Sequence, residues 1–285
     1  MSFGKLYIVA TPIGNLSDIT LRAIETLKSV DVILAEDTRH SRTLLQHYQI
    51  NKPLLALHEH NEKQMAEKII ERCQQGESFA LISDAGTPLM SDPGFELVRA
   101  MQQAQLPVMA IPGACALVAA LSIAGLPTDR FCFLGFLPAK SSGRKEKLAA
   151  LKTESMTVIL YEAPHRILDC VQDIGEVLGS ERLIVLVKEI TKPFETVKHG
   201  TSIELVAWLE QDPLRQKGEF VVLIAGKTIQ PDVDSGIMLD DKTILQQLLT
   251  EVSIKQAVSL AVKLTGHKKN ELYALALQLK EGDLL

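Results

Sequence analysis

Six charged residues stand at or just beyond the ends of apolar runs that the sequence predicts to be buried strands. They are Glu36, Asp37, Arg39, Glu162, Lys188 and Glu189. Carboxylates can take up a proton, and guanidinium or ammonium groups can stabilise a developing negative charge. Because ligands of open α/β sheets bind outside the carboxyl ends of the strands, these residues are candidates for a catalytic site. For Lys188 and Glu189, a surface ion pair is the structural alternative.

Three turns between predicted strands and helices offer a second kind of chemistry, the binding of a ligand by backbone groups. Residues 10–16 expose backbone amides after the first strand. Residues 82–94 combine two Gly, two Pro and two Asp, which is typical of a stiff, shaped loop. Residues 111–117 are small enough to let a flat ligand approach the backbone. None is a G-x-G-x-x-G fingerprint or a P-loop, so the sequence does not support a nicotinamide or nucleoside triphosphate site.

Continuous apolar runs recur between helical patterns. They lack the alternation of half-buried strands, and therefore predict strands covered on both faces. They are Leu6–Ala10, Val32–Ala35, Phe79–Ile82, Val108–Ile111, Val158–Tyr161, Leu183–Val187 and Phe220–Ala225. Amphipathic stretches between them, such as residues 61–75, predict helices. This order predicts an α/β fold with a largely parallel sheet.

The segment from Gly125 to Leu137 contains several Gly and Pro residues and predicts a domain boundary near the middle of the chain. We expect an N-terminal α/β domain over residues 1–122 and a second α/β domain over residues 123–228. The polar residues 229–241 predict a linker, and residues 242–285 predict a helical tail.

The tail carries the start and stop signals of two helices. Residues 253–256, Ser-Ile-Lys-Gln, predict a capping box that opens one helix, and Gly266 ends it. A second helical pattern spans residues 268–279. Two helices joined by a short turn that contains Gly resemble a helix-turn-helix unit. The alternative is a helical hairpin that only packs on the body of the protein or on a second subunit.

Composition indicates a globular protein in a reducing compartment. Hydrophobic residues make up 46% of the chain and charged residues 23%. The four cysteines, Cys73, Cys115, Cys132 and Cys170, lie far apart, which predicts free thiols rather than a zinc cluster or a disulfide framework. Cys115 is expected to pack as a small apolar side chain, since no partner base lies nearby. Without a signal-peptide pattern or a stretch long enough to span a membrane, we expect a cytoplasmic protein.

The charge distribution limits how nucleic acid could bind. The net charge is −5, so an attraction for nucleic acid must come from local patches. Residues 135–153 and residues 253–280 each contain five Lys or Arg residues against one Glu. The alternative for both segments is a solvated helix face.

Four segments together resemble the class III, or tetrapyrrole methylase, superfamily of methyltransferases, and within it the family of bacterial 16S rRNA (cytidine-2′-O)-methyltransferases. They are Val9–Leu16, Ala35–Arg39, Ser83–Gly94 and Tyr161–Arg166. The resemblance covers residues 5–226, and the tail is similar to the carboxyl-terminal module of that family. It implies a cleft for S-adenosylmethionine between two α/β domains and a homodimer. It also implies a cytidine in the decoding region of small-subunit (16S) ribosomal RNA as the methyl acceptor.

The resemblance further implies the roles of individual residues. We expect S-adenosylmethionine to contact Pro12, Ile13, Asp84, Ala85, Gly86, Thr87, Cys115, Ala116, Glu162 and Leu223. Transfer from a sulfonium is an in-line displacement that requires alignment and removal of the hydroxyl proton, but no metal. The base is expected among Glu36, Asp37, Glu162 and Glu189, while Arg39, Arg166 and Lys188 hold RNA phosphates or the developing alkoxide. The two basic segments and the tail would hold the rest of the RNA.

Two departures from the tetrapyrrole branch bear on the acceptor. Residues 83–88 read Ser-Asp-Ala-Gly-Thr-Pro where that branch usually has a Gly-Asp-Pro loop, and residues 112–115 read Pro-Gly-Ala-Cys where it usually has Ser or Thr. Both weaken a small tetrapyrrole-like acceptor, which is the alternative within the same fold. A non-catalytic module that holds nucleic acid or a partner is the alternative outside enzymes.

Overall fold

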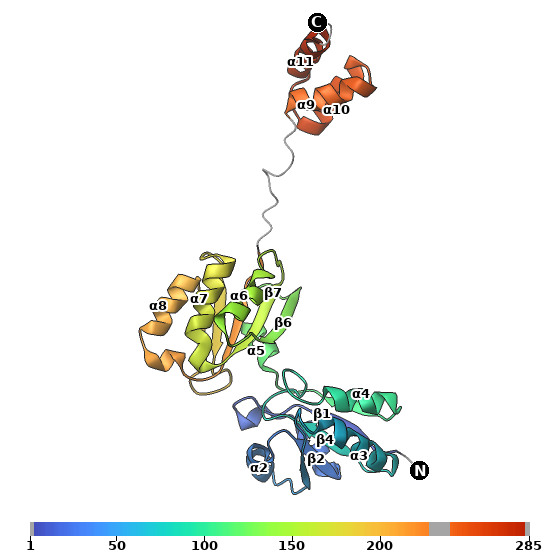
Figure 1. The fold of residues 1–285 in the computed structure, drawn as a ribbon, viewed down its shortest axis with the longest axis vertical. Helices are drawn as coiled ribbons and strands as arrows, with labels where there is room; N and C mark the ends of the chain where they lie inside the picture. The colour runs from blue at the N-terminus through green and yellow to red at the C-terminus, as the bar shows by residue number, and fades with distance from the viewer. Residues whose placement is uncertain (1–2, 228–239, 283–285) are drawn as a thin grey trace. The chain divides into compact units, whose positions relative to one another are not determined.

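The structure, a computed structural model, describes residues 3–227 and 240–282. The chain divides into two compact units, residues 1–227 and residues 228–285 (Figure 1). Each unit has hydrophobic core clusters of its own. The predicted linker 229–241 lies outside the described residues except for Asp240 and Asp241.

The first half of the larger unit is a five-stranded sheet in which all four pairings are parallel. In spatial order its strands are β3 (Leu54–Ala56), β2 (Val32–Ala35), β4 (Phe79–Ile82), β1 (Leu6–Val9) and β5 (Val108–Ile111). Its helices are α1 (Leu21–Ser29), α2 (Thr38–His47), α3 (Glu62–Gln74) and α4 (Phe95–Gln103). Leu34 and Leu81 pack against α3 and α4, whereas Ile33 and Ile82 pack against α1 and α2. Since neighbouring strand residues point to opposite faces, helices on both faces explain the unbroken apolar runs.

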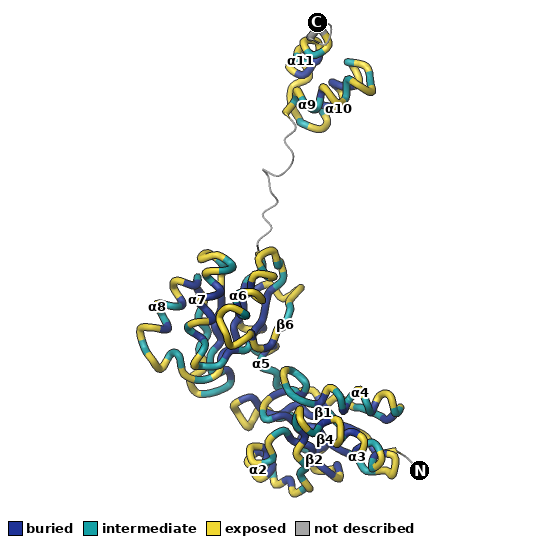
Figure 2. Tube along the Cα trace, viewed as in Figure 1, coloured by how far each residue is buried: buried dark blue, intermediate teal, exposed yellow. Residues whose placement is uncertain are grey.

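The second half of the larger unit is a mixed five-stranded sheet. Its strands in spatial order are β6 (Phe131–Phe136), β7 (Thr157–Glu162), β10 (Phe220–Ile224), β8 (Ile184–Lys188) and β9 (Thr196–Gly200). Only β6 and β7 pair in parallel, and the other three pairings are antiparallel. Helices α6 (Ser141–Ala149), α7 (Ile167–Leu178) and α8 (Ser202–Glu210) share one core with this sheet, and α5 (Ala116–Ile123) shares another. The buried residues follow the strands of both halves (Figure 2).

The predicted α/β architecture is confirmed, with differences at the edges of the sheets. All seven predicted strands form to within one residue at each end. Three further strands, β3, β6 and β9, were not predicted, and each lies at the edge of a sheet. The expectation of a largely parallel sheet holds for the first sheet, whereas the second contains mostly antiparallel pairs. The predicted boundary after residue 122 falls at the end of α5, which packs on the second sheet.

The smaller unit contains three helices, α9 (Asp241–Glu251), α10 (Ile254–Thr265) and α11 (Lys269–Gly282), around a core of its own. The predicted capping box of Ser253 and Gln256 is confirmed, and Gly266 ends α10 with a φ of 72°. Helix α9 was not predicted as a separate element. Among the described helices of both units, none is long and apolar enough to cross a membrane.

Candidate active site

A cavity of about 470 Å³ lies between the carboxyl ends of the first sheet and the second sheet. From the first sheet it is lined by Ile13, Glu36, Asp84, Ala85, Gly86, Thr87, Met90, Ser91, Asp92, Cys115 and Ala116. From the second sheet it is lined by Phe136, Tyr161, Glu162, Ala163, Pro164, Ile190, Glu219, Phe220 and Val221. Its volume lies within the range of small-molecule sites, about 300–1,000 Å³. All three predicted backbone turns therefore meet at one cavity.

Backbone contacts join these turns. The Thr11 N–H donates to the Gly86 carbonyl at 2.8 Å, and the Gly86 N–H returns a bond to the Thr11 carbonyl at 3.1 Å. The Thr87 hydroxyl donates to the Ala114 carbonyl at 3.0 Å, which ties in the third turn. Gly86 has a φ of 80°, and a Cβ there would lie 3.1 Å from the Ile13 side chain. Since L side chains rarely adopt such a φ, Gly86 is required to close this turn.

Carboxylates from the first sheet form one wall of the cavity. Glu36 follows β2, and Asp84 and Asp92 belong to the loop after β4. Burial and the negative charges of Asp92 and Asp84 raise the pKa of Glu36 above its ordinary value. Burial also raises the pKa of Asp92, and Asp84 adds to the effect while the Ser83 hydroxyl opposes it. Among the described residues, no Lys, Arg or His forms an ion pair with these three carboxylates.

Tyr161 forms part of the opposite wall. Its hydroxyl accepts a hydrogen bond of 3.1 Å from the Leu117 N–H, in the first turn of α5. The ring packs edge-on against Phe133 and Phe136, with centroids 4.8 and 5.8 Å away. Burial, together with the neighbouring Cys115, raises the pKa of Tyr161 to about 12. The phenol is therefore neutral at physiological pH and presents an uncharged polar edge to the cavity.

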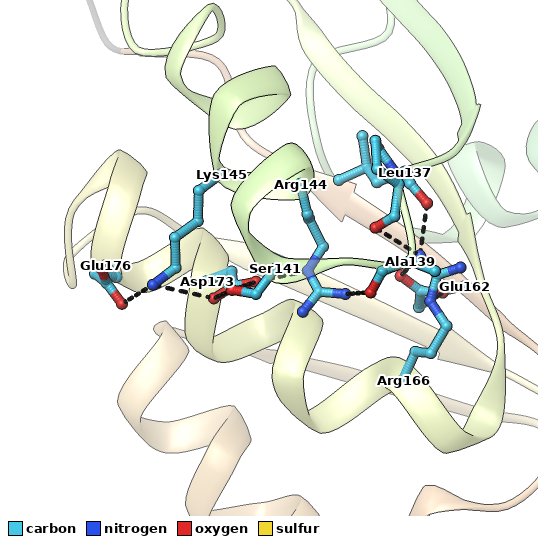
Figure 3. A network of polar contacts seen from close by, with 10 residues as sticks. Leu137, Ala139, Ser141, Arg144, Lys145, Glu162, Arg166, Asp173 and Glu176 are labelled. Carbon is cyan, nitrogen blue, oxygen red and sulfur yellow. Dashed lines mark hydrogen bonds and ion pairs between the residues drawn. The ribbon is translucent and has the colours of Figure 1, made fainter.

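Glu162 reaches the cavity but is held by an ion pair (Figure 3). Arg166 Nε lies 3.0 Å from Glu162 Oε1, and the side chain of Glu162 is 1% exposed. Arg166 Nη2 also donates to the carbonyls of Leu137 at 2.6 Å and Pro138 at 3.3 Å. Arg166 therefore ties Glu162 to the backbone at Leu137 and Pro138, and its expected contact with RNA phosphates stays a prediction.

Lys188 and Glu189 do not line the cavity. Glu189 Oε1 accepts hydrogen bonds of 2.9 Å from Lys192 Nζ and of 2.9 Å from the Glu219 N–H. Although burial opposes it, the hydrogen bonds from Lys192 and from the Glu219 backbone lower the pKa of Glu189. Glu189 thus forms its ion pair with Lys192 rather than with Lys188. A carboxylate held in this way is a weak base.

The other predicted residues lie around the cavity or behind it. Asp37 caps α2, since its Oδ1 accepts a bond of 2.8 Å from the Arg39 N–H, and the Arg39 side chain is exposed. Pro12 and Leu223 are buried, and neither is among the residues that line the cavity. Leu223 belongs to the core beneath α5, and Phe220 and Val221 provide the cavity surface of β10 instead. The expected cofactor contacts of Pro12 and Leu223 stay predictions.

The basic segment 135–153 is only partly free to contact RNA. Arg144 is 2% exposed, and its Nε lies 2.6 Å from Asp173 Oδ2 (Figure 3). Lys145 Nζ lies 2.6 Å from Glu176 Oε2 and 3.5 Å from Asp173 Oδ1. Two of the five cations thus join α6 to α7. Exposed cations of this segment are Lys140, Lys147 and Lys152.

Asp92 and Tyr161 are cavity residues that the predicted set omitted. Both residues lie in segments on which the family resemblance rests, Ser83–Gly94 and Tyr161–Arg166. An Asp and a Tyr at these positions carry no signal that distinguishes them from their neighbours. As to metals, the described ranges 3–227 and 240–282 contain no group of three or more His, Cys, Asp or Glu side chains that could hold an ion. The chemistry available at the cavity is therefore that of carboxylates, a neutral phenol and backbone amides.

Comparison with known families gives two matches. Residues 5–206 match the family described as Tetrapyrrole (Corrin/Porphyrin) Methylases, and residues 238–280 match the RsmI C-terminal HTH domain. Ribosomal RNA small subunit methyltransferase I of Escherichia coli O157:H7 is 51% identical over 97% of this chain and 96% of that protein. The protein of the same name from Pasteurella multocida (strain Pm70) is 52% identical over 96% of this chain and 97% of its own length.

Solved structures share the fold of the larger unit at low sequence identity. Cobalt precorrin-4 methyltransferase, a cobalamin biosynthetic enzyme, has a TM-score of 0.58 at 20% identity and covers 78% of this chain and 94% of its own. Diphthine synthase has a TM-score of 0.59 at 14% identity and covers 78% of this chain and 90% of its own. At these identities the likeness concerns the fold alone.

Proposed function

Since the chain belongs to the tetrapyrrole methylase family and, within it, to the family of ribosomal RNA small subunit methyltransferase I, we propose that it methylates RNA. The methyl donor is S-adenosylmethionine, and the acceptor is the ribose 2′-hydroxyl of a cytidine in the decoding region of 16S ribosomal RNA. The observation that carries this proposal is the cavity between the two sheets, where the backbone turns lie beside the carboxylates of Glu36, Asp84 and Asp92, none of which is in an ion pair with a described residue.

The cavity suits this donor in size and in charge. S-adenosylmethionine supplies a methyl group already activated by a positively charged sulfur. The joined turns around Ile13, Gly86 and Ala116 offer backbone groups to hold it. The negative charges of Asp84 and Asp92 favour a cation in the cavity. Alignment of donor and acceptor is the main task left to the protein in an in-line displacement.

Glu36 is the residue that we assign as general base. Of the four carboxylates expected to include the base, Asp37 caps α2, Glu162 is paired with Arg166, and Glu189 with Lys192. Glu36 lines the cavity without such a partner. Its raised pKa makes its carboxylate a better proton acceptor than an ordinary glutamate. Glu36 would take the proton of the ribose hydroxyl as the oxygen attacks the methyl group.

We place the protein in the cytoplasm as a homodimer. The four cysteines are free in the structure, as expected for a reducing compartment. Exposed large apolar side chains concentrate in three consecutive elements, β5, α5 and β6, which supports a subunit interface there. They are Met109, Val118, Ile123, Phe131, Leu134 and Phe136. Sedimentation or light scattering of the purified protein measures the oligomeric state, and a monomer at micromolar concentration would contradict the dimer.

Transfer of labelled methyl groups tests the proposed activity. The purified protein is incubated with S-adenosylmethionine that carries a labelled methyl group and with separated, unmethylated ribosomal subunits. We expect label in the RNA of the small subunit, at a ribose that resists alkaline cleavage of the following phosphodiester. Label in neither subunit, or on a base, would contradict the proposal. Calorimetric titration with S-adenosylmethionine measures cofactor binding separately.

A further inference from the structure

The loop from Leu57 to Asn61 follows β3 and lies beside the proposed base. Ala35 and Ala56 are register partners in the pairing of β2 with β3. The Leu57 N–H donates to the Ala35 carbonyl at 2.9 Å, so the chain leaves β3 next to Glu36. The negative charge of Glu59 also contributes to the raised pKa of Glu36. The loop therefore belongs to the surroundings of the cavity, although it does not line it.

Asn61 holds this loop in one conformation. Its Oδ1 accepts a hydrogen bond of 2.9 Å from the His58 N–H, and its Nδ2 donates to the Ala56 carbonyl at 3.0 Å. The Asn61 and Glu62 N–H groups both donate to the His58 carbonyl, at 3.0 and 3.1 Å. Glu62 is itself buried and accepts a bond of 2.9 Å from the Leu97 N–H of α4. Three side chains, His58, Glu59 and His60, are thus presented on a rigid support.

The three presented side chains have capacity for a ligand. Glu59 and His60 are exposed, and Glu59 is not in an ion pair with any described residue. The rings of His58 and His60 pack edge-on with centroids 5.9 Å apart. Nδ1 of His58 is buried and has no hydrogen-bond partner among the described residues.

The order of the strands places the backbone turns and the loop after β3 on opposite sides of Glu36. The backbone turns lie after β4, β1 and β5, on one side of Glu36. Strand β3 and its loop lie on the other side of β2, at the edge of the sheet. With the cofactor on the turns, an acceptor whose hydroxyl reaches Glu36 extends toward the loop after β3. Beside the 2′-hydroxyl the ribose carries its base on C1′ and a phosphate on C3′, and the exposed carboxylate of Glu59 disfavours the phosphate, so the base is the part that suits this loop.

We infer that the loop reads the base of the acceptor nucleotide, with Glu59 as hydrogen-bond acceptor for the exocyclic amino group of cytosine and His60 as stacking partner. The inference rests on the proposed function. A carboxylate can accept a hydrogen bond from the exocyclic amino group of cytosine. Uracil has a carbonyl at this position, which cannot donate a hydrogen bond to a carboxylate. RNA-binding proteins stack splayed-out bases on aromatic rings, including those of His. The ring of His58 packs edge-on against that of His60.

Paired acceptors test this inference with the full-length protein. Unmethylated small subunits are prepared with either cytidine or uridine at the nucleotide that the wild-type protein labels. We expect Glu59→Ala to lower kcat/KM for the cytidine acceptor by roughly 10- to 100-fold and to leave the uridine acceptor nearly unchanged. We expect His60→Ala to lower both alike, because stacking tolerates either base. S-adenosylmethionine affinity, measured by calorimetry, is expected to stay at the wild-type value in both variants.

Glu67→Gln is the matched control, since Glu67 is an exposed acid on α3, which begins directly after this loop. It is expected to retain the wild-type preference between the two acceptors. An unchanged preference in Glu59→Ala would overturn the inference, and so would an equal loss on both acceptors. If the wild-type protein labels no RNA, the proposed function fails. If it labels RNA but Glu59→Ala keeps the wild-type preference, only the inference about the loop fails.

Discussion

The two walls of the cavity use carboxylates in opposite ways. On the side of the second sheet, Glu162 in the wall is paired with Arg166, and Glu189, just outside the cavity, is paired with Lys192. On the side of the first sheet, Glu36, Asp84 and Asp92 line the cavity with no cation beside them. Both arrangements place acids near strand ends. They differ in whether the protein itself neutralises the charge.

The difference separates structural acids from acids available for chemistry. An ion-paired carboxylate is held in its charged form, which lowers its pKa and its ability to take up a proton. Carboxylates that are buried without an ion-pair partner and close to other acids have raised pKa values, as those of Glu36 and Asp92 illustrate. Such perturbed groups in a cavity are typical of functional sites. The comparison therefore selects Glu36 over Glu162 and Glu189 as the base.

The largest expected effect is on catalysis. Glu36→Gln removes the proton acceptor and is expected to slow methyl transfer about 10²- to 10⁴-fold. Single-turnover transfer under saturating S-adenosylmethionine measures it, and calorimetry is expected to show retained cofactor binding. Glu189→Gln, which changes a paired carboxylate outside the cavity, is the control and is expected to stay near the wild-type rate. Wild-type turnover in Glu36→Gln would remove the assignment.

The second effect is on stability and concerns the buried ion pair of Arg144 with Asp173. Arg144→Met leaves Asp173 buried without its main partner, which is expected to lower the free energy of unfolding by about 3–5 kcal/mol. Urea unfolding followed by the fluorescence of Trp208, the only Trp of the chain, reports on this half. The double variant Arg144→Met/Asp173→Leu is expected to recover most of the loss. Equal stability of wild type and Arg144→Met would show that the pair contributes nothing.

A third, smaller effect concerns the pH profile. Glu36 must be ionised to accept a proton, and the negative charge of Asp92 opposes its ionisation. Asp92→Asn is therefore expected to lower the pKa of Glu36 and to move the acid limb of the kcat profile to lower pH. Part of the shift is expected to remain, because burial is the larger cause. An acid limb that moves to higher pH, or not at all, would contradict this coupling.

The smallest effect is again on stability, with the opposite sign to that of Arg144. The folded-state pKa of Glu36 is raised, so its charge disfavours the folded state at pH values above that pKa. Glu36→Gln is expected to raise the melting temperature slightly at neutral pH. The gain should disappear as the pH falls below the unfolded-state pKa, where both states of the wild type carry a neutral carboxyl. Scanning calorimetry across this range measures it, and a gain that persists at low pH would point to another cause.

Six of the seven predicted strands have no exposed residue, whereas the edge strand β5 was predictable from its apolar residues although Met109 and Ala110 are exposed. An unbroken apolar run reports burial on both faces directly, as in Val32–Ala35 and Phe220–Ile224. The three unpredicted strands lie at sheet edges. Strand β9 contains the polar residues Lys198 and His199, β3 has only three residues, and β6 has an irregular register between Phe133 and Phe136. The direction of the strands in the second sheet could not be predicted from the sequence either, because an antiparallel central strand such as β10 can be as apolar as a parallel one.

The candidate site was predictable where it depends on short segments. The turns containing Ile13, Gly86 and Ala116 were expected at one cavity, and they meet there. What the sequence could not provide was the partner of each charged residue. Arg166 finds the Leu137 carbonyl 29 positions away, and Arg144 finds Asp173 at the same separation. Pairings at such a distance along the chain depend on how helices and loops pack, which residue type and local spacing do not encode.

The bridge between Thr11 and Gly86 is made of main-chain atoms. A cradle of this kind is insensitive to most side-chain substitutions, so a lineage can keep its methyl donor while the surrounding sequence drifts. New acceptors would then arise by altering the peripheral loops that meet them. Inhibitors that bind these main-chain turns would consequently also bind distant enzymes with the same backbone geometry. Selectivity would have to come from contacts with the side chains beyond Glu36.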